Sequence, residues 1–333
     1  MKKPTLHVLG VPSTITTNKK YLSCAFTQKV FKFIRMMNLF DYNIIHYGHE
    51  ESEVECENIP IISSDFFDKQ VRDSHLSENM TKNANPYPAT KELFAEFYNN
   101  AVSNLIKYVV SGDIVCYTYN AGTYPNIMRK LKSIYNDIFH VETGIGYFNT
   151  YADFRAFESY HCHSYVMGYN NKEGKRPYGG TSPGAPSFSD WVIPNYFEEG
   201  DFDFSPNDKE DYFVYLGRMH RWTKGTEIAM QVSEKCNLPL LMAGPDEPDG
   251  HFKKTKLPKG IEYVGSVGLD ERRKLLSKAK GKFMPSLFAE PFGGSGIESL
   301  LSGTPVITTD HSVFNEWNLH GYTGYRCRTF SEF

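Results

Sequence analysis

The stretch FAEPFGGSGIESLLSGTPVITTD, residues 288–310, decides the fold class. It follows a strand-like segment, Lys282–Pro285, and its glycine-rich loop leads into a helical pattern at Ser295–Ser302. A second apolar run follows at Pro305–Thr308. Strand, glycine loop, helix and strand in this order predict a βαβ unit, and βαβ units imply a parallel sheet.

The same alternation of short apolar runs and helical patterns extends over the rest of the chain. The expected elements are Thr5–Gly10, Cys24–Met37, Tyr42–Tyr47, Ala89–Val110, Asp113–Tyr117, Tyr124–Ser133, Asp137–Glu142, Tyr212–Leu216, Thr226–Lys235, Pro239–Ala243, Ile261–Val264 and Asp270–Lys278.

A change of composition divides these elements into two groups. Residues 172–206 are rich in Gly, Pro, Ser and acidic residues, interrupted by the strand-like Trp191–Pro194. We therefore predict two Rossmann-like, doubly wound α/β domains, 1–195 and 196–333, with a cleft between them. Ligands of such sheets lie outside the carboxyl ends of the strands, so the chemistry is expected on the loops that follow strands.

Composition excludes several classes of protein. The 333 residues are 40% hydrophobic and 23% charged, with a net charge of −3 and a pI of about 6.4. No basic excess indicates a nucleic-acid partner, and no run approaches the roughly 20 apolar residues that span a bilayer. Six scattered cysteines without a C-x-x-C pair suit a reducing compartment, so a cytoplasmic location is expected.

Two glutamates bracket the glycine-rich loop within residues 288–310. The amides of this loop, at the start of a helix, form an anion site, and glycine lets the backbone approach a diphosphate. Glu290 precedes the helix and Glu298 lies about one turn inside it, so their carboxylates could hold a sugar and a ribose. The alternative is a capped helix with surface acids. The loop residues expected at the donor are Phe292, Gly293, Gly294 and Ser295.

A second segment supplies positive charge. The sequence YLGRMHRWTKG, residues 215–225, ends a strand at Leu216 and continues with Gly217, Arg218 and Lys224. Two cations at the carboxyl end of a strand fit a leaving diphosphate, whose charge grows as the glycosidic bond breaks. Solvated surface charge is the alternative for this segment taken alone.

Together the two segments resemble a known family, the retaining glycosyltransferases of the GT-B fold, family 4 in the sequence-based classification. That family carries G-R-x5-K-G and E-x-F-G-x4-E in its second domain. Both patterns are complete here, in residues 217–225 and 290–298. The resemblance implies that Arg218 and Lys224 bind the donor diphosphate, that Glu290 contacts the donor sugar and that Glu298 contacts the ribose. It also implies retention at the anomeric carbon by front-face attack.

The resemblance implies a nucleotide diphosphate sugar as co-substrate, without a further cofactor, and a carbohydrate, lipid-linked or small-molecule acceptor. Val264 and Gly265 open a loop expected to frame the base. Gly10, in the loop Gly10–Thr14, takes the place of that family's glycine loop near the donor phosphate. Peripheral membrane contact stays open, because many relatives act on lipid-linked acceptors.

In the first domain, Glu142 is the candidate acid. It is expected to end a strand, where it either orients or deprotonates an acceptor hydroxyl or caps a turn. His140 is expected to be structural, and Glu158 to lie on the solvated face of a helix. His46 and His49 follow a strand and could reach the cleft, whereas His220 and His311 have no clear role.

Two patterns suggest a metal and are rejected. Asp201–Asp203 is a D-x-D match in the expected linker, and His161–His163 are adjacent residues that on a strand would point to opposite faces. We therefore predict metal-independent activity.

Other functions fit the same fold. A nucleotide-sugar epimerase, a disaccharide synthase or a phosphorylase would use the same donor site, and a non-catalytic binding module would use only part of it. In the resembled family further helices usually follow the position of Phe333, the last crossing back onto the first domain. The sequence therefore predicts a minimal enzyme or a fragment.

Overall fold

The computed structural model describes residues 3–12, 16–19, 24–73, 90–119, 122–172, 188–219, 223–247 and 250–333, with only the backbone of 71–73 and 170–172. Three residues named above, Thr14, Ala89 and His220, lie outside these ranges. The chain divides into two compact units, Met1–Tyr196 and Phe197–Phe333.

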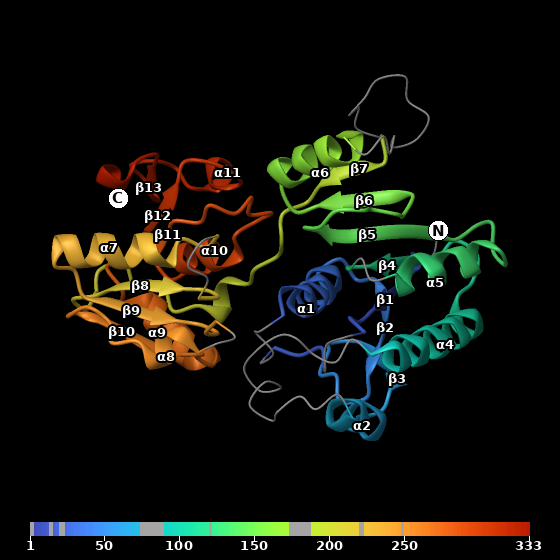
Figure 1. Ribbon diagram of the computed structural model, residues 1–333. Coiled ribbons are helices and arrows are strands. Elements are labelled where there is room, and N and C mark those ends of the chain that lie inside the picture. The colour runs from blue at the N-terminus through green and yellow to red at the C-terminus, as the bar shows by residue number, and fades with distance from the viewer. Residues whose placement is uncertain are drawn as a thin grey trace. The chain divides into compact units, whose positions relative to one another are not determined.

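The first unit is an α/β unit around a parallel sheet (Figure 1). Its sheet has seven strands in the order β3-β2-β1-β4-β5-β6-β7. The elements are β1 (Thr5–Leu9), α1 (Ala25–Asn38), β2 (Asn43–His49), β3 (Glu57–Ile62), α2 (Ser64–Asp73), α4 (Lys91–Tyr108), β4 (Ile114–Tyr117), α5 (Thr123–Lys132), β5 (Phe139–Ile145), β6 (Phe154–Phe157), α6 (Tyr160–Lys172) and β7 (Asp190–Val192).

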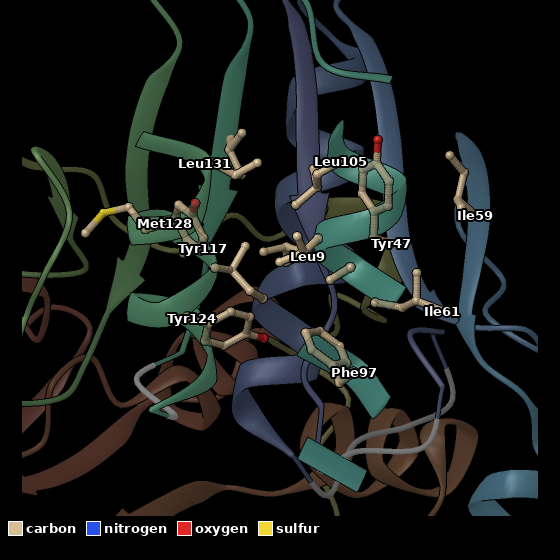
Figure 2. Packing of buried hydrophobic residues seen from close by; sticks show 14 of the residues in the cluster. Leu9, Tyr47, Ile59, Ile61, Phe97, Leu105, Tyr117, Tyr124, Met128 and Leu131 are labelled. Carbon is tan, nitrogen blue, oxygen red and sulfur yellow. The ribbon is translucent and has the colours of Figure 1, made fainter. Parts of the chain in front are cut away.

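Apolar side chains cover both faces of this sheet, as side chains alternate along a strand. On β1, Leu6 and Val8 pack with Val30 and Ile34 of α1. Leu9 faces the other way, into a cluster formed with α4 and α5. In Figure 2 that cluster surrounds Leu9 with aromatic rings and aliphatic side chains from both the strands and the helices. Helices on both faces make this a doubly wound sheet.

The second unit repeats the plan with six parallel strands in the order β10-β9-β8-β11-β12-β13. Its elements are η1 (Glu199–Asp201), β8 (Phe213–Leu216), α7 (Thr226–Cys236), β9 (Leu240–Ala243), α8 (His251–Lys254), β10 (Ile261–Gly265), α9 (Leu269–Lys278), β11 (Gly281–Met284), α10 (Gly294–Leu301), β12 (Val306–Thr309), α11 (Phe314–Trp317), β13 (Gly324–Cys327) and η2 (Phe330–Glu332).

The strand order of the second unit determines where a ligand can bind. The chain runs from β8 outward through β9 to β10, then returns to β11 on the other side of β8. The loops after β8 and β11 therefore leave the sheet edge in opposite directions, and a ligand-binding crevice is expected at the carboxyl ends of these two strands. The segments 215–225 and 288–310 supply these two loops.

Three strands, β3, β6 and β13, have no counterpart among the expected elements. They are four to six residues long, and β3 carries Pro60, which an edge strand of the sheet accommodates. Two expectations were wrong. Glu158 lies at a bend between β6 and α6 and is buried, and His161–His163 lie on α6 instead of a strand.

Candidate functional site

The loops after β8 and β11 are bound to each other at the crevice. The amides of Leu287 and Phe288 both donate to the carbonyl of Thr223, at 2.8 and 2.9 Å. The hydroxyl of Tyr215, on β8, donates to the carbonyls of Arg218 and Lys224. The loop that carries the cations is thus fixed to the loop that carries Glu290.

Gly225 makes this close approach possible. Its φ is +67°, a left-handed conformation, and a Cβ there would overlap the carbonyl oxygen of Pro285. The final glycine of the G-R-x5-K-G pattern therefore has a steric reason: only glycine has both the conformational freedom and the space.

Replacing Gly225 with alanine is expected to lower the free energy of unfolding by about 2 kcal/mol or more, because strain and overlap act together. Gly260→Ala is the matched control: Gly260 also has a positive φ, +84°, but no atom lies within 4 Å of the point where a Cβ would stand. Urea denaturation of both variants checks the difference. Equal destabilisation would show that the contact with Pro285 is unimportant.

Glu290 and Lys224 form the centre of the candidate site. Lys224 Nζ donates to Glu290 Oε1 in an ion pair. The Ser286 hydroxyl donates to the same oxygen at 2.9 Å, and the Lys224 ammonium lies 4.6 Å from the centre of the Phe288 ring. The Glu290 carboxylate is nearly buried, whereas about a third of the Lys224 side chain is exposed. The pair therefore holds the carboxylate in one orientation beside a cation that a ligand can reach.

A left-handed glycine and contacts with Trp317 hold the glycine-rich loop in place. Gly293, with φ +75°, is the N-cap of α10, and the Trp317 indole N–H donates to the carbonyl of Phe292 at 2.8 Å. The Trp317 ring also fills the space where a side chain at Gly296 would lie. The first amides of an α-helix have no partner within the helix. The amides of Gly294 and Ser295 are those on which the predicted anion site depends, whereas the Gly296 amide donates to the Gly293 carbonyl at 2.8 Å.

Glu298 lies one turn into α10 and is held by Arg272 of α9. Arg272 Nε donates to Glu298 Oε2 at 2.7 Å, and Nη2 donates to the same oxygen. Both side chains are mostly buried. The sequence predicted Glu298 but did not single out Arg272 in the run Asp270–Lys278.

The other predicted donor residues lie at the same edge of the sheet. Gly217 and the exposed Arg218 follow β8 directly, and the Gly217 amide donates to the carbonyl of Ala243. Val264 and Gly265 end β10, where the Gly265 carbonyl accepts from the amide of Gly244. These residues occupy the carboxyl ends of their strands, as expected.

Gly10 occupies the corresponding position in the first unit. Its amide donates to the carbonyl of Tyr47 at 2.8 Å and its carbonyl accepts from the Tyr124 hydroxyl. A Cβ at Gly10 would press on the buried ring of His46. Gly10 and His49 line a small pocket at the ends of β1 and β2, together with Val11, Pro12, Thr17, Gly48, Ile62 and Phe97.

The prediction that Glu142 ends a strand was wrong. β5 continues to Ile145, so Glu142 lies within the strand and not at its end, and its side chain is fully buried. Its carboxylate accepts hydrogen bonds from the Tyr147 hydroxyl and from the amides of Tyr151 and Ala152. It therefore stabilises the loop after β5 and is not placed to deprotonate an acceptor. His140, beside it on the same strand, is buried and bonded to the Tyr117 hydroxyl.

Burial raises the pKa of Glu142 from 4.5 to about 7, although the amides of Ala152 and Tyr151 oppose the shift. The folded state then binds more protons than the unfolded state between these values, so this group stabilises the fold at low pH. That contribution is expected to disappear as the pH rises from about 5 to about 8, and Glu142→Gln should lack this dependence. Urea denaturation across the range tests it, with Glu92→Gln as control. Parallel curves for wild type and Glu142→Gln would contradict it.

Three further polar side chains belong to the site and were missed by the sequence reasoning: Ser286, Arg272 and Lys282. Of these three, only Lys282 could have been noticed in the sequence, because a charged residue inside the apolar strand β11 is unusual.

Within the described ranges, no three His, Cys, Asp or Glu residues are grouped so that they could hold a metal. Nor does any helix among those residues have the length and apolarity to cross a membrane.

The site can be compared with known proteins. Residues 197–331 match the family model of glycosyl transferases group 1. An O-antigen chain mannosyltransferase of Salmonella typhimurium is 29% identical over 134 residues, 38% of this chain and 36% of that protein. An uncharacterized glycosyltransferase of Methanocaldococcus jannaschii is 26% identical over 125 residues, 35% and 32% of the two chains. The aligned stretches thus span about a third of these relatives.

Solved structures match both units. Sucrose-phosphate synthase of Thermosynechococcus elongatus aligns with 99% of this chain and 88% of its own, with a TM-score of 0.67 and 14% identity. HepE of Anabaena, in complex with UDP and glucose, covers 99% and 87% with a TM-score of 0.62 and 13% identity. Residues 197–331 are therefore a glycosyl transferases group 1 domain, in a chain whose two parallel α/β units have the fold of the GT-B glycosyltransferases.

Proposed function

We propose that this protein is a retaining glycosyltransferase that moves a sugar from a nucleotide diphosphate sugar to a carbohydrate, lipid-linked or small-molecule acceptor. The observation that carries the proposal is the Lys224–Glu290 pair at the crevice between β8 and β11. It places one cation and one oriented carboxylate beside a glycine-rich loop at a helix N-terminus.

The cations act on the leaving group. As the bond from the anomeric carbon to the diphosphate breaks, negative charge grows on the departing phosphate oxygen. In this proposal Arg218, Lys224 and the amides that open α10 are already in position before that charge develops, so they stabilise it without reorganisation during the reaction. Side chains and amides supply this charge, and the proposed reaction proceeds without a metal.

The carboxylates act on hydroxyl groups. Glu290 keeps one oxygen on Lys224 and Ser286, which leaves the carboxylate oriented to accept hydrogen bonds from the donor sugar. Glu298, oriented by Arg272, accepts from the ribose. Fixed acceptors of this kind hold the anomeric carbon in one place relative to the diphosphate. Retention follows from front-face attack, with a donor phosphate oxygen taking the acceptor proton.

Ligands held by the structural neighbours support a nucleotide-linked donor. The HepE structure holds UDP and glucose, and another neighbour, TarM, holds UDP together with alpha-GlcNAc-glycerol, at 11% identity and a TM-score of 0.62. The Salmonella relative is a mannosyltransferase. The sugars named for these proteins differ, so a panel of donors and acceptors is needed.

Incubation of the protein with a panel of UDP-, GDP- and ADP-sugars and glycan acceptors tests the proposal, with products analysed by mass spectrometry and anomeric NMR couplings. Transfer with the donor's anomeric configuration kept, and unchanged by EDTA, is expected. An inverted product would contradict retention, and activity lost on chelation and restored by Mn²⁺ would contradict the metal-free reaction. Donor binding without turnover would favour the binding module, and an epimerised donor an epimerase.

A further inference from the structure

Lys282 is a buried cation that the proposed reaction does not use. It lies within β11, between β8 and β12 in the sheet of the second unit, and its residue surface is fully inaccessible. Burial of an ammonium group is strongly unfavourable unless partners compensate it. An apolar residue of the same length would fill this buried position equally well, so packing alone does not explain the charge.

The ammonium group points to the donor loop. Lys282 Nζ donates to the Ser295 hydroxyl oxygen at 2.6 Å, and Met284 Sδ lies 3.9 Å away as a weak acceptor. Ser295 is the second residue of α10, two residues after the left-handed Gly293. The buried charge therefore contacts the same turn whose amides form the expected anion site.

The charges around Lys282 do not balance. Glu298 of α10 and Glu290 of the preceding loop attract it, and Arg272 of α9 repels it. Arg272 is paired with Glu298, and Lys224 with Glu290. This group of described residues contains three cations and two carboxylates, which leaves one excess positive charge beneath the loop. An anion on the loop would compensate it.

The pKa of Lys282 lies close to neutral pH. Burial lowers its pKa from 10.5 to about 7; Glu298 and Glu290 raise it, and Arg272 lowers it further. A negative ligand near Ser295 favours the charged form and raises this pKa. Ligand binding and protonation must then reinforce each other.

We propose that Lys282 is a positioning residue that couples donor binding to proton uptake through the Ser295 hydroxyl. When charged, Lys282 donates to Ser295 Oγ, so the single hydroxyl hydrogen of Ser295 is free to donate to a diphosphate oxygen. When neutral, the amine accepts that hydrogen and turns it away from the ligand. This inference rests on the proposed function, because it takes the anion to be the donor diphosphate.

The sign of the pH effect follows from this scheme. Below about pH 7 Lys282 is already protonated in the free protein, so donor binding takes up few protons. Above about pH 7 the free protein has a neutral Lys282, and binding must protonate it. Donor affinity is thus expected to fall as the pH rises above about 7, while the number of protons taken up grows toward about one.

Calorimetry of the full chain tests the coupling. UDP-glucose and GDP-mannose are the probes, because each phosphate of a nucleotide sugar carries one ester and one anhydride linkage, so its single acidic group does not titrate near neutral pH. Titrations at about pH 6, 7 and 8, in buffers of different ionisation enthalpy, give the affinity and the protons taken up. Lys282→Met removes the amine with little change in volume, and Lys282→Gln replaces it with a shorter, neutral amide. Lys280→Met, two residues away, removes a half-exposed lysine that pairs with Asp211.

Wild type and Lys280→Met are expected to take up protons increasingly above about pH 7. Lys282→Met should melt no lower than wild type, because a buried charge is gone. Both Lys282 variants are expected to bind the donor about tenfold more weakly at about pH 7 and without proton uptake. Equal uptake in the Lys282 variants, or none in wild type, would overturn the coupling while donor binding stands. Failure of wild type to bind any nucleotide sugar would remove the proposed function and this inference with it.

Discussion

Replacing Glu290 with alanine is expected to reduce turnover by about 10²–10³-fold, because a preorganised polar contact made in the transition state is lost. The change removes the oriented acceptor for donor-sugar hydroxyls and leaves Lys224 without its carboxylate. Binding of the nucleotide diphosphate alone should weaken much less, since Lys224 and the loop amides remain. Initial rates with saturating donor, together with nucleotide affinity, separate the two effects.

Glu262→Ala is the matched control, since Glu262 lies on β10 of the same sheet and is exposed. It should leave turnover and nucleotide binding unchanged. Melting temperatures establish that both variants are folded. Turnover of Glu290→Ala within about threefold of wild type would remove Glu290 from the reaction, because a lost catalytic contact costs more than that.

Replacing Lys224 with alanine is expected to weaken donor binding by about tenfold and to lower turnover by a further factor of about 10². The ammonium group contacts the ligand's charge in both the ground state and the transition state, so both parameters change, unlike those of Glu290→Ala. Steady-state kinetics over a range of donor concentrations measures the two losses separately.

Lys235→Ala serves as the control, because Lys235 lies in the last turn of α7, is exposed and is away from the loops after β8 and β11. Because Lys224 and Glu290 are paired, the double variant should lose less than the two single losses combined. Strict additivity would show that the pair does not act as a unit. Near-normal kinetics of Lys224→Ala would contradict its role at the diphosphate.

The repeating α/β pattern was predictable because most of its longer helices and strands show their own periodicity. The helices α2 and α6 were not among the expected elements, and neither were α8 and α11, which have four residues each. The segment 288–310 contains a loop, helix and strand whose turn chemistry is explicit in the sequence, and the structure places them where expected. Strands of four residues such as β6 and β13 carry too few side chains to show alternation. Their pairing depends on neighbours distant in the chain.

The candidate site was predictable where motifs fix it and not where tertiary contacts do. Arg218, Lys224, Glu290 and Glu298 were predicted from the two motifs, but Arg272 stands among several charged residues of α9 and nothing local distinguishes it. Glu142 is the converse case: the sequence singled it out, but the fold gives it a structural role. The sequence predicted a strand that ends at Glu142, whereas the strand continues to Ile145 and the carboxylate is buried.

The central claim is that the second unit binds a nucleotide diphosphate between the loops after β8 and β11. A crystal structure of the protein soaked with UDP and, separately, with GDP tests it most directly. We predict diphosphate density against the amides of Gly294 and Ser295, with Lys224 and Arg218 on its oxygens and Glu298 at the ribose. Density for the diphosphate at any other place on the second unit, with these side chains uninvolved, would contradict it.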